Sequence, residues 1–450
     1  MLLVASYVFY GTWNWKFLSL IFISTTFDYI CGIKIHESTE IKKRKAFLFL
    51  SILGNLSILG FFKYYNFFAS SLGGLLDYFG VSVELSILNF ILPVGLSFYT
   101  FKAMSYAIDI YRKEIEPARK FLDFALYVSF FPQLIAGPIE KTNQLLPQIV
   151  ATRKLKLTWF YEGCYLIFWG LFQKVFIADN LARIVNPVFA GPTYNGATVL
   201  LAIYAFAFQI FCDFAGYSNI ARGLGRLMGF DIMVNFRMPY FSTNPREFWQ
   251  RWHISLSTWL RDYLYIPLGG NRKGVIRTCR NLFLTMLLGG LWHGAAWTFV
   301  IWGAYHGILL VLQRIFQPLI KTFSFHNIII TKIWHLIRII FFFQVICVGW
   351  LIFRARSISQ VLEMLNSLFF NFSITPDVIH MLFYFIFFIF FLLTIQIFQY
   401  IYDDLMVVLK WPTYAKTSFV LIISYLFIYV MALGEDALIG GGRDFIYFQF

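Results

Sequence analysis

Long apolar runs alternate with short polar and basic stretches along almost the whole chain. A run of about 20 residues is long enough to cross the hydrocarbon core of a bilayer as a helix. Inside a bilayer every backbone polar group needs an internal partner, and a helix provides one. The pattern therefore predicts spanning helices at residues 1–30, 46–68, 86–110, 157–179, 195–221, 297–316, 332–353, 376–402 and 417–434.

Two further apolar runs, 121–138 and 282–293, are too short to span and are predicted to be re-entrant or tilted pieces buried in the bundle. The predicted fold class is all-α, a polytopic integral membrane protein with about 9 to 11 transmembrane helices plus short buried helices. No repeat or long soluble insertion interrupts the pattern. We expect one membrane domain over 1–450, with a cytoplasmic basic loop and amphipathic helix region at 222–280.

Composition excludes a soluble globular protein. Hydrophobic residues make up 59% of the chain and charged residues only 13%, against about 25% charged residues in typical soluble domains. The first apolar run lacks the basic start and small-residue cleavage site of a secretory signal, so it is predicted to be a retained span.

The net charge of +14 comes from basic residues that gather between the expected spans. In a soluble chain this charge would suggest nucleic acid as a partner, but here positive-inside topology explains it, and we expect no nucleic-acid partner. Pairing of the intervening spans puts every basic cluster on the cytoplasmic side. These clusters lie at residues 34–45, 112–120, 141–156 and 222–280.

Ionisable residues inside apolar spans are costly, so they are the first candidates for function. His293 lies in an apolar stretch interrupted only by glycines. Burial disfavours the charged imidazolium, so this histidine is expected to be neutral and able to accept a proton as a general base. The alternative is a core histidine that hydrogen-bonds a carbonyl. The same reasoning applies to His306.

A helix is predicted over 244–263, because Asn244 can cap it and Pro245 suits its first position. Counted at 100° per residue, His253 falls on the apolar, tryptophan-rich face of this helix. An interfacial amphipathic helix with tryptophan anchors would show the same stripe. The function of His253 therefore stays open on the pattern alone.

The remaining polar residues in the spans have structural interpretations. Asp109 and Asp213 are expected to pair with arginine or tyrosine and to lock the bundle. The glycine-rich, basic loop at 267–274 could receive phosphates, but it lacks the P-loop pattern. The five cysteines are widely spaced and are interpreted as core residues, so we expect neither a disulfide frame nor a metal site.

Two sequence blocks resemble the membrane-bound O-acyltransferase family, within it the branch of alginate O-acetylation membrane components. They are Phe248–Arg272, which contains Arg251-Trp252-His253, and Gly290–Ala295, which contains Leu291-Trp292-His293-Gly294. Supporting blocks extend the resemblance over nearly the whole chain. They lie at 93–99, 131–139 and 444–450.

The resemblance implies that His293 is the catalytic residue and that His253 is the second signature polar position. Family members usually carry a further apolar segment before Ser6, so either the start at Met1 is misassigned or the first family helix is missing at the N-terminus. Around these two histidines we expect substrate-binding residues, with the arginines attracting the phosphates of the donor, although positive-inside charge explains the arginines equally well. The candidates are Trp252, Trp292, Asp213, His306, Arg251 and Arg261.

The expected activity is transfer of an acetyl group, with acetyl-CoA as donor and no permanently bound cofactor. His293 would act as general base, and His253 would bind or polarise the acyl carbonyl. The acceptor would be an envelope or extracellular polysaccharide, alginate-like or peptidoglycan, reached with a separate extracytoplasmic, esterase-like partner protein. The expected location is the bacterial inner membrane, in contact with lipid.

Three other functions remain open. A D-alanyl transfer component for teichoic acid shares the fold but takes its acyl group from a carrier protein. A transporter would use Asp109, Asp213, His293 and His306 along a proton or solute path, and would be expected to show inverted repeats, which the sequence lacks. A scaffold that only anchors a polysaccharide synthase would give neither histidine block a role.

Overall fold

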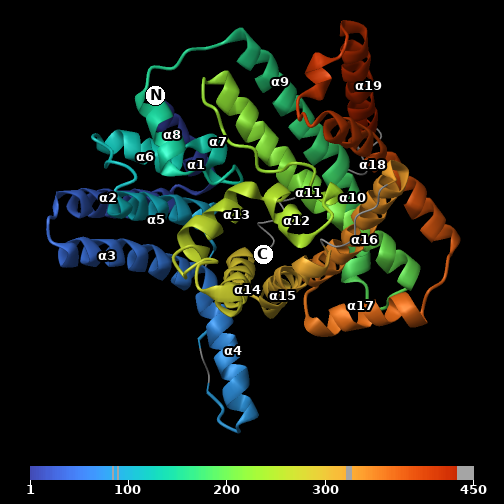
Figure 1. Ribbon diagram of the computed structural model, residues 1–450, viewed down its shortest axis with the longest axis horizontal. Coiled ribbons are helices and arrows are strands. Elements are labelled where there is room, and N and C mark those ends of the chain that lie inside the picture. Colours follow the sequence, from blue (N-terminus) through green and yellow to red (C-terminus); the bar gives the residue numbers. More distant parts are fainter. Residues whose placement is uncertain (84–85, 89–90, 321–326, 433–450) are drawn as a thin grey trace. The chain divides into compact units, whose positions relative to one another are not determined.

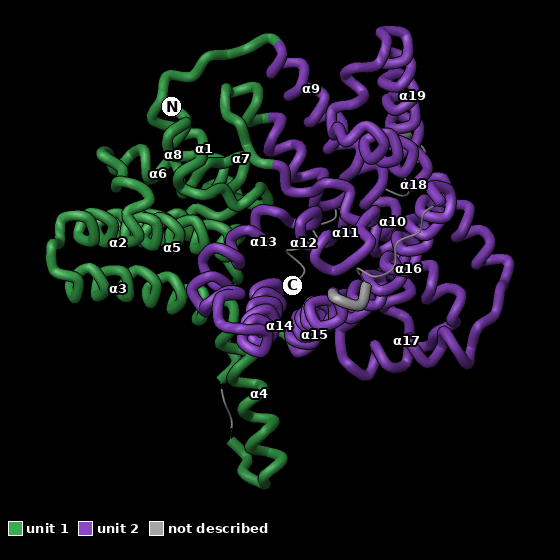
Figure 2. The backbone as a smooth tube through the Cα atoms, viewed as in Figure 1, with its two compact units in different colours: residues 1–157, 224–233, 294–296 green, residues 158–223, 234–293, 297–450 purple. Residues whose placement is uncertain are grey.

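The computed structural model describes residues 1–83, 86–88, 91–320 and 327–432, and these residues form helices without strands. The supporting block at 444–450 lies outside the described residues. The chain divides into two compact units, each built from separate segments of the sequence (Figure 2). Unit 1 comprises residues 1–157, 224–233 and 294–296, and unit 2 comprises 158–223, 234–293 and 297–450. The prediction of one domain over 1–450 stays a prediction.

In unit 1, the helices α2, α5 and α3 lie side by side (Figure 1). The buried carboxylate of Asp28 on α2 accepts hydrogen bonds from Ser51 Oγ at 2.5 Å and from Asn55 Nδ2 at 2.9 Å, both on α3. Side-chain hydrogen bonds of this kind join helices where apolar burial cannot. The helices of unit 1 are α1 (Leu2–Asn14), α2 (Lys16–Glu37), α3 (Ile41–Leu59), the π-helical turn η1 (Gly60–Tyr64), α4 (Tyr65–Tyr78), α5 (Leu96–Arg112), α6 (Phe121–Ser129), α7 (Phe131–Leu134) and α8 (Thr142–Val150).

Unit 2 contains the longest helices and both signature histidines. Its α-helices are α9 (Leu157–Leu171), α10 (Asp179–Ala190), α11 (Gly196–Leu227), α12 (Pro245–Arg251), α13 (Ile254–Leu260), α14 (Gly274–His293), α15 (Trp297–Ile320), α16 (Ile328–Arg354), α17 (Ile358–Phe370), α18 (Pro376–Tyr402) and α19 (Thr413–Ala432). Shorter turns are η2 (Phe172–Ala178), η3 (Pro239–Phe241), η4 (Arg261–Tyr265) and η5 (Val407–Lys410).

Glycine pairs bring the main helices of unit 2 into backbone contact. A Cβ added to Gly216 on α11 would lie 2.7 Å from the carbonyl oxygen of Gly170 on α9, and a Cβ added to Gly223 would lie 2.7 Å from that of Gly163. Small residues allow membrane helices to approach in this way. The seam fixes α9 against α11 along two turns of helix.

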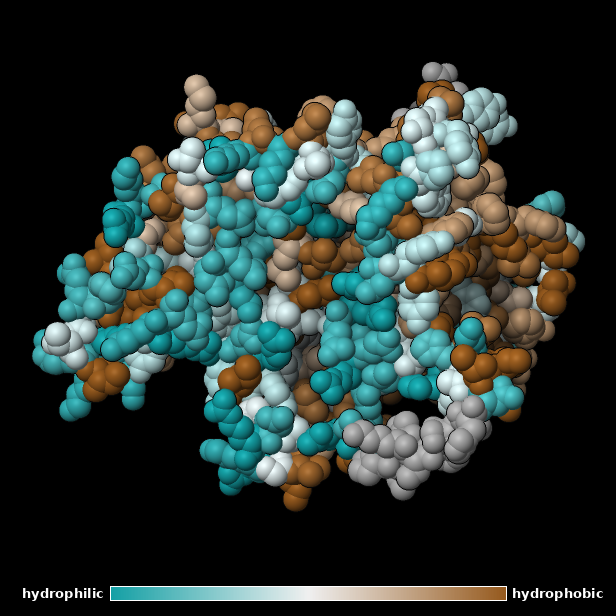
Figure 3. Space-filling model, turned by 45° about the horizontal axis from the view of Figure 1, so that its top comes forward, coloured by the Kyte–Doolittle hydropathy of each residue, from teal (hydrophilic) through white to brown (hydrophobic). Residues whose placement is uncertain are grey.

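Seven helices in the described residues are long and apolar enough to cross a membrane. Large apolar side chains remain exposed on their surfaces, and one face of the molecule shows broad hydrophobic areas (Figure 3). Together with the helical fold, these spans confirm the predicted all-α, multi-pass class. The spans are Lys16–Glu37, Ile41–Tyr78, Gly196–Leu227, Trp297–Gln317, Ile328–Arg354, Pro376–Tyr402 and Thr413–Val430.

Several predicted boundaries were wrong. The run 1–30 is broken between Asn14 and Lys16, so it forms α1 and α2. The run 86–110 yields only the 17-residue α5, which begins after Gly95 at φ 75°. The run 157–179 is divided by a π-helical turn, and 282–293 is the end of the 20-residue α14. An apolar run in the sequence indicates that a segment avoids water, but it does not show where a helix begins, breaks or ends.

Candidate functional site

The segment that carries His253 is two short helices and not one. Asn244 caps α12 as predicted, because its Oδ1 accepts the Glu247 backbone N–H at 3.0 Å. The predicted continuous helix over 244–263 is wrong, since the backbone of His253 enters the left-handed region at φ 41° and separates α12 from α13. Left-handed backbone at a non-glycine residue is costly and persists only where surrounding contacts hold it.

Asn235 holds His253 in this conformation. The Asn235 backbone carbonyl accepts the Ile254 N–H at 2.9 Å. Its side-chain Oδ1 accepts the Ser255 N–H at 3.1 Å and the Ser255 hydroxyl at 2.9 Å, and lies 3.2 Å from His253 Nδ1. Its Nδ2 donates to Ser218 Oγ on α11 at 3.2 Å. One buried amide therefore ties the helix break to the core of unit 2.

These contacts assign the tautomer of His253. A backbone N–H can only donate, so the Asn235 atom that meets the Ser255 N–H is the oxygen. The same oxygen faces His253 Nδ1, which must therefore carry the hydrogen. Burial lowers the pKa of His253 to about 3, so the ring is neutral at physiological pH. In a neutral imidazole the other nitrogen, Nε2, is a hydrogen-bond acceptor.

Asn235 is the residue of this site that sequence analysis missed. It lies in the nonhelical stretch 229–238, where no periodicity marks a face. Only its position 18 residues before His253 could have drawn attention to it, and spacing without a regular element predicts no contact.

Replacing Asn235 by leucine is expected to destabilise the protein. The change leaves the buried Ser255 N–H and the His253 Nδ1–H without their acceptor, and each orphaned buried group costs about 1–3 kcal/mol. Thermal unfolding in detergent measures the effect. Ser218→Ala is the matched control, because it removes only the Nδ2 contact and should lower the melting temperature less. Equal losses in the two variants would contradict the assigned role of Oδ1.

His293 ends α14, and α14 packs closely on α15 at two glycines. A Cβ on Gly290 would lie 2.3 Å from the carbonyl oxygen of Phe299, and one on Gly303 would lie 2.5 Å from that of Met286. His293 is 3% exposed. This packing holds the second signature histidine inside the unit.

The two signature histidines come together in an aromatic cluster. The ring centroids of His253 and His293 are 6.5 Å apart, although the residues are 40 positions apart in the sequence. Trp302 on α15 packs edge-on against His293 at 4.9 Å and against His306 at 4.7 Å. Trp292 lies 5.0 Å from His293. Two imidazole rings enclosed by indole rings suit proton transfer away from bulk water.

The structure brings three of the predicted substrate-binding residues to one region. Trp252 is fully buried and packs on Trp350 at 4.7 Å, and Trp350 in turn lies 6.2 Å from Trp302. Trp292 contacts both signature histidines, and His306 lies beyond Trp302. Their binding of substrate stays a prediction.

The other predicted residues are paired with charged side chains of the protein. Asp213 is paired with Lys174 at 2.6 Å, and its expected pairing with arginine or tyrosine stays a prediction. Arg251 pairs with Glu247 at 3.0 Å and Arg261 with Asp262 at 2.6 Å. A role for either arginine in attracting phosphate stays a prediction. Asp109 is buried in α5 of unit 1, and its pairing is also untested.

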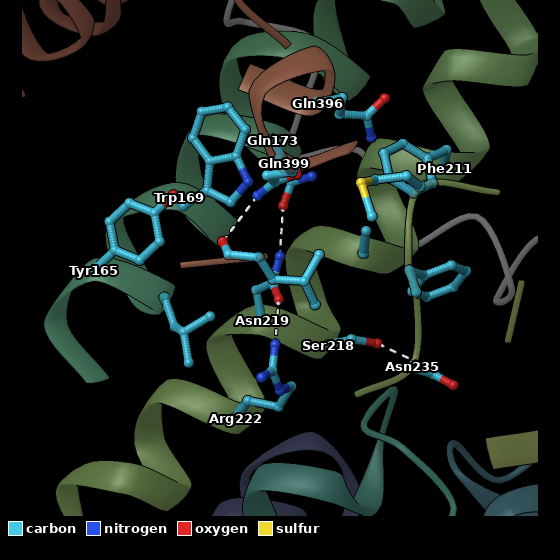
Figure 4. Close-up of a pocket in the computed structure, with 15 residues that line it drawn as sticks. Tyr165, Trp169, Gln173, Phe211, Ser218, Asn219, Arg222, Asn235, Gln396 and Gln399 are labelled. Atoms are coloured by element: carbon cyan, nitrogen blue, oxygen red, sulfur yellow. Dashed lines mark hydrogen bonds between the residues drawn. The ribbon is translucent and has the colours of Figure 1, made fainter. Parts of the chain in front are cut away.

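A small polar cavity adjoins Asn235 (Figure 4). Gln173 Oε1 accepts from Asn219 Nδ2 at 2.8 Å, and Asn219 Oδ1 accepts from Arg222 at 3.2 Å. The volume of about 30 Å³ suits one or two water molecules and no acyl group. Ser218 and Asn235 line it, so polar space reaches the residue that holds His253.

The described residues contain no group of three or more histidine, cysteine or acidic side chains able to hold a metal ion. All five cysteines are free thiols.

Comparison with known proteins agrees with the motif blocks. The model of the membrane-bound O-acyltransferase family matches residues 2–353. The probable alginate O-acetylase AlgI of Pseudomonas putida is 44% identical over 370 residues, covering 82% of this chain and 74% of that protein. The peptidoglycan O-acetyltransferase of Helicobacter pylori is 36% identical over 399 residues, covering 82% and 73%. The teichoic acid D-alanyltransferase of Bacillus subtilis is 32% identical over 286 residues, covering 60% and 70%.

Proposed function

This chain belongs to the membrane-bound O-acyltransferase family, and from that premise we propose that it transfers an acetyl group from acetyl-CoA across the membrane for O-acetylation of a bacterial cell-envelope or extracellular polysaccharide. O-Acyltransferase activity and a multi-pass membrane location follow from the family. The observation that carries the proposal is the meeting of His253 and His293 at 6.5 Å within a buried aromatic cluster.

His293 is the proposed general base. It takes the proton from the acceptor hydroxyl while the oxygen attacks the carbonyl carbon of the thioester. The carbon–sulfur bond then breaks, and the proton passes from His293 to the leaving thiolate, which leaves as free thiol. Such a base contributes about 10²–10⁴-fold to the rate. His253 is held as the Nδ1–H tautomer, so its Nε2 offers a lone pair to a hydroxyl or N–H of the substrate.

A polysaccharide as final acceptor is supported by the relatives, whose names refer to alginate and to peptidoglycan. We propose that acetyl transfer to sugar is completed by a separate extracytoplasmic, esterase-like protein. Basic residues around the 222–280 region support a cytoplasmic approach of the anionic donor, and the bacterial relatives support the inner membrane as its location.

A second candidate function is D-alanyl transfer to teichoic acid. The relative of that name in Bacillus subtilis is 32% identical to this chain. This reaction differs in the donor, which would be a carrier-protein thioester, and not in the chemistry assigned to His293.

An assay in inverted membrane vesicles, prepared with and without this protein, distinguishes acetyl transfer from D-alanyl transfer. Vesicles supplied with [¹⁴C]acetyl-CoA are expected to incorporate label into polysaccharide or into a captured partner protein only when the chain is present. A parallel sample receives a ¹⁴C-D-alanyl carrier protein. If label is incorporated only from the carrier protein, the reaction is alanyl transfer and not acetyl transfer. If neither donor gives incorporated label, both proposed functions are contradicted.

A further inference from the structure

Three fully buried tryptophans carry indole N–H groups that no acceptor in the described part of the chain satisfies. They are Trp252, Trp302 and Trp350, each at most 1% exposed. A buried indole N–H normally finds a hydrogen-bond partner, because leaving it without one costs free energy. All three lie in the aromatic cluster that surrounds the signature histidines, so indole N–H donors without an acceptor are concentrated there.

Trp302 differs from the other two in what it contacts. Its ring lies 4.9 Å from that of His293, at an interplanar angle of 85°. Trp252 and Trp350 pack on each other and on phenylalanines, and neither packs on His293 among the described residues. The residue after Trp302 is Gly303, which lies in the α14–α15 contact. Trp302 is thereby fixed relative to the end of α14, where His293 stands.

Acyl transfer also needs a donor aimed at the carbonyl oxygen, because this oxygen gains negative charge when the carbonyl carbon becomes tetrahedral. His253 was expected to polarise the carbonyl. It cannot do so in the assigned tautomer, since its Nδ1–H is committed to Asn235 and its Nε2 has a lone pair, which repels a carbonyl oxygen. Stabilising the charge on the carbonyl oxygen therefore requires another N–H group next to His293.

Building on the proposed function, we propose that the indole N–H of Trp302 donates a hydrogen bond to the acyl carbonyl and stabilises the oxyanion that forms on it. His293 then moves the proton, Trp302 holds the carbonyl oxygen, and His253 accepts a hydrogen bond from the substrate. No proton leaves the indole in this step. A donor that acts mainly on the developing charge raises kcat more than it improves substrate binding.

The test replaces Trp302 by benzothienylalanine, which keeps the ring shape but has sulfur in place of N–H. We expect kcat for acetyl transfer to fall by about 10²–10³-fold, with KM nearly unchanged. The matched control is the same replacement at Trp350, which is equally buried and also meets no acceptor among the described residues. This control should retain wild-type kcat, since Trp350 does not contact His293.

A second measurement does not depend on turnover. A ¹³C-labelled methyl-ketone analogue of acetyl-CoA, bound to the protein, reports hydrogen bonding through the stretching frequency of its carbonyl. We expect the band to shift to higher frequency when Trp302, and not Trp350, loses its N–H. The role of Trp302 would be overturned if the wild type transfers acetyl groups while the variant at position 302 keeps the same kcat and the same carbonyl frequency. No acetyl transfer and no ketone binding by the wild type would instead refute the proposed function.

Discussion

Cells in which His293 is replaced by alanine are expected to lose O-acetylation of their envelope and extracellular glycans to the level of cells without the protein. His293 is the proposed base, and removal of a positioned base costs about 10²–10⁴-fold in rate. The O-acetyl content of purified glycans measures the effect. Membrane levels of the variant must match the wild type, because a truncated buried side chain can also reduce folding.

His335→Ala is the matched control for His293→Ala. His335 lies on α16, outside the aromatic cluster, and its Nε2 contacts the Tyr400 hydroxyl at 2.7 Å. Its removal should leave acetylation unchanged. Undiminished acetylation in the His293 variant would exclude His293 as the base, and a scaffold role for the chain would then gain support.

Gly290→Ala is expected to produce the second large effect. The added Cβ would come within 2.3 Å of the Phe299 carbonyl oxygen and 2.8 Å of the Gly303 Cα, so α14 and α15 must separate. Overpacking of this kind typically costs about 1–3 kcal/mol. His293 follows three residues later on α14, and a 1 Å displacement of a catalytic group can lower the rate about 10²-fold.

Thermal unfolding and acetyl transfer per folded molecule separate the two parts of this effect. Gly74→Ala is the control, because Gly74 also lies in a helix and a Cβ there meets nothing within 4 Å. We expect this control to match or slightly exceed wild-type stability. If Gly290→Ala behaved like Gly74→Ala, the close contact of α14 and α15 would not position His293.

The sequence predicts the class of this fold well because a bilayer imposes a single requirement, about 20 apolar residues in a helix. It predicts breaks poorly. The π-helical turn at Phe172–Ala178 and the end of α1 at Asn14 leave the apolar pattern unchanged. Asp28 was also overlooked, since its partners Ser51 and Asn55 lie on another helix and become visible only when α2 and α3 are packed.

The functional site was likewise predictable from the sequence only in part. His253 and His293 could be singled out because polar residues in apolar surroundings need a reason. Their meeting could not be derived, because it depends on contacts between segments 40 residues apart. The pairing of Asp213 with Lys174 was not foreseen for a related reason. Lys174 lies in the π-helical turn, where helical spacing no longer shows which side chain faces α11.

The left-handed backbone at His253 constrains which amino acids this position tolerates. Glycine accepts this conformation freely and asparagine readily, whereas β-branched residues are strongly disfavoured there. A saturation library at this position would therefore separate effects on folding from effects on chemistry. His253→Gly and His253→Asn would accumulate as folded protein that lacks the imidazole ring. His253→Val would be lost through misfolding before its activity could be measured. A survey that measures activity alone would confuse the two groups, so abundance must be recorded beside it.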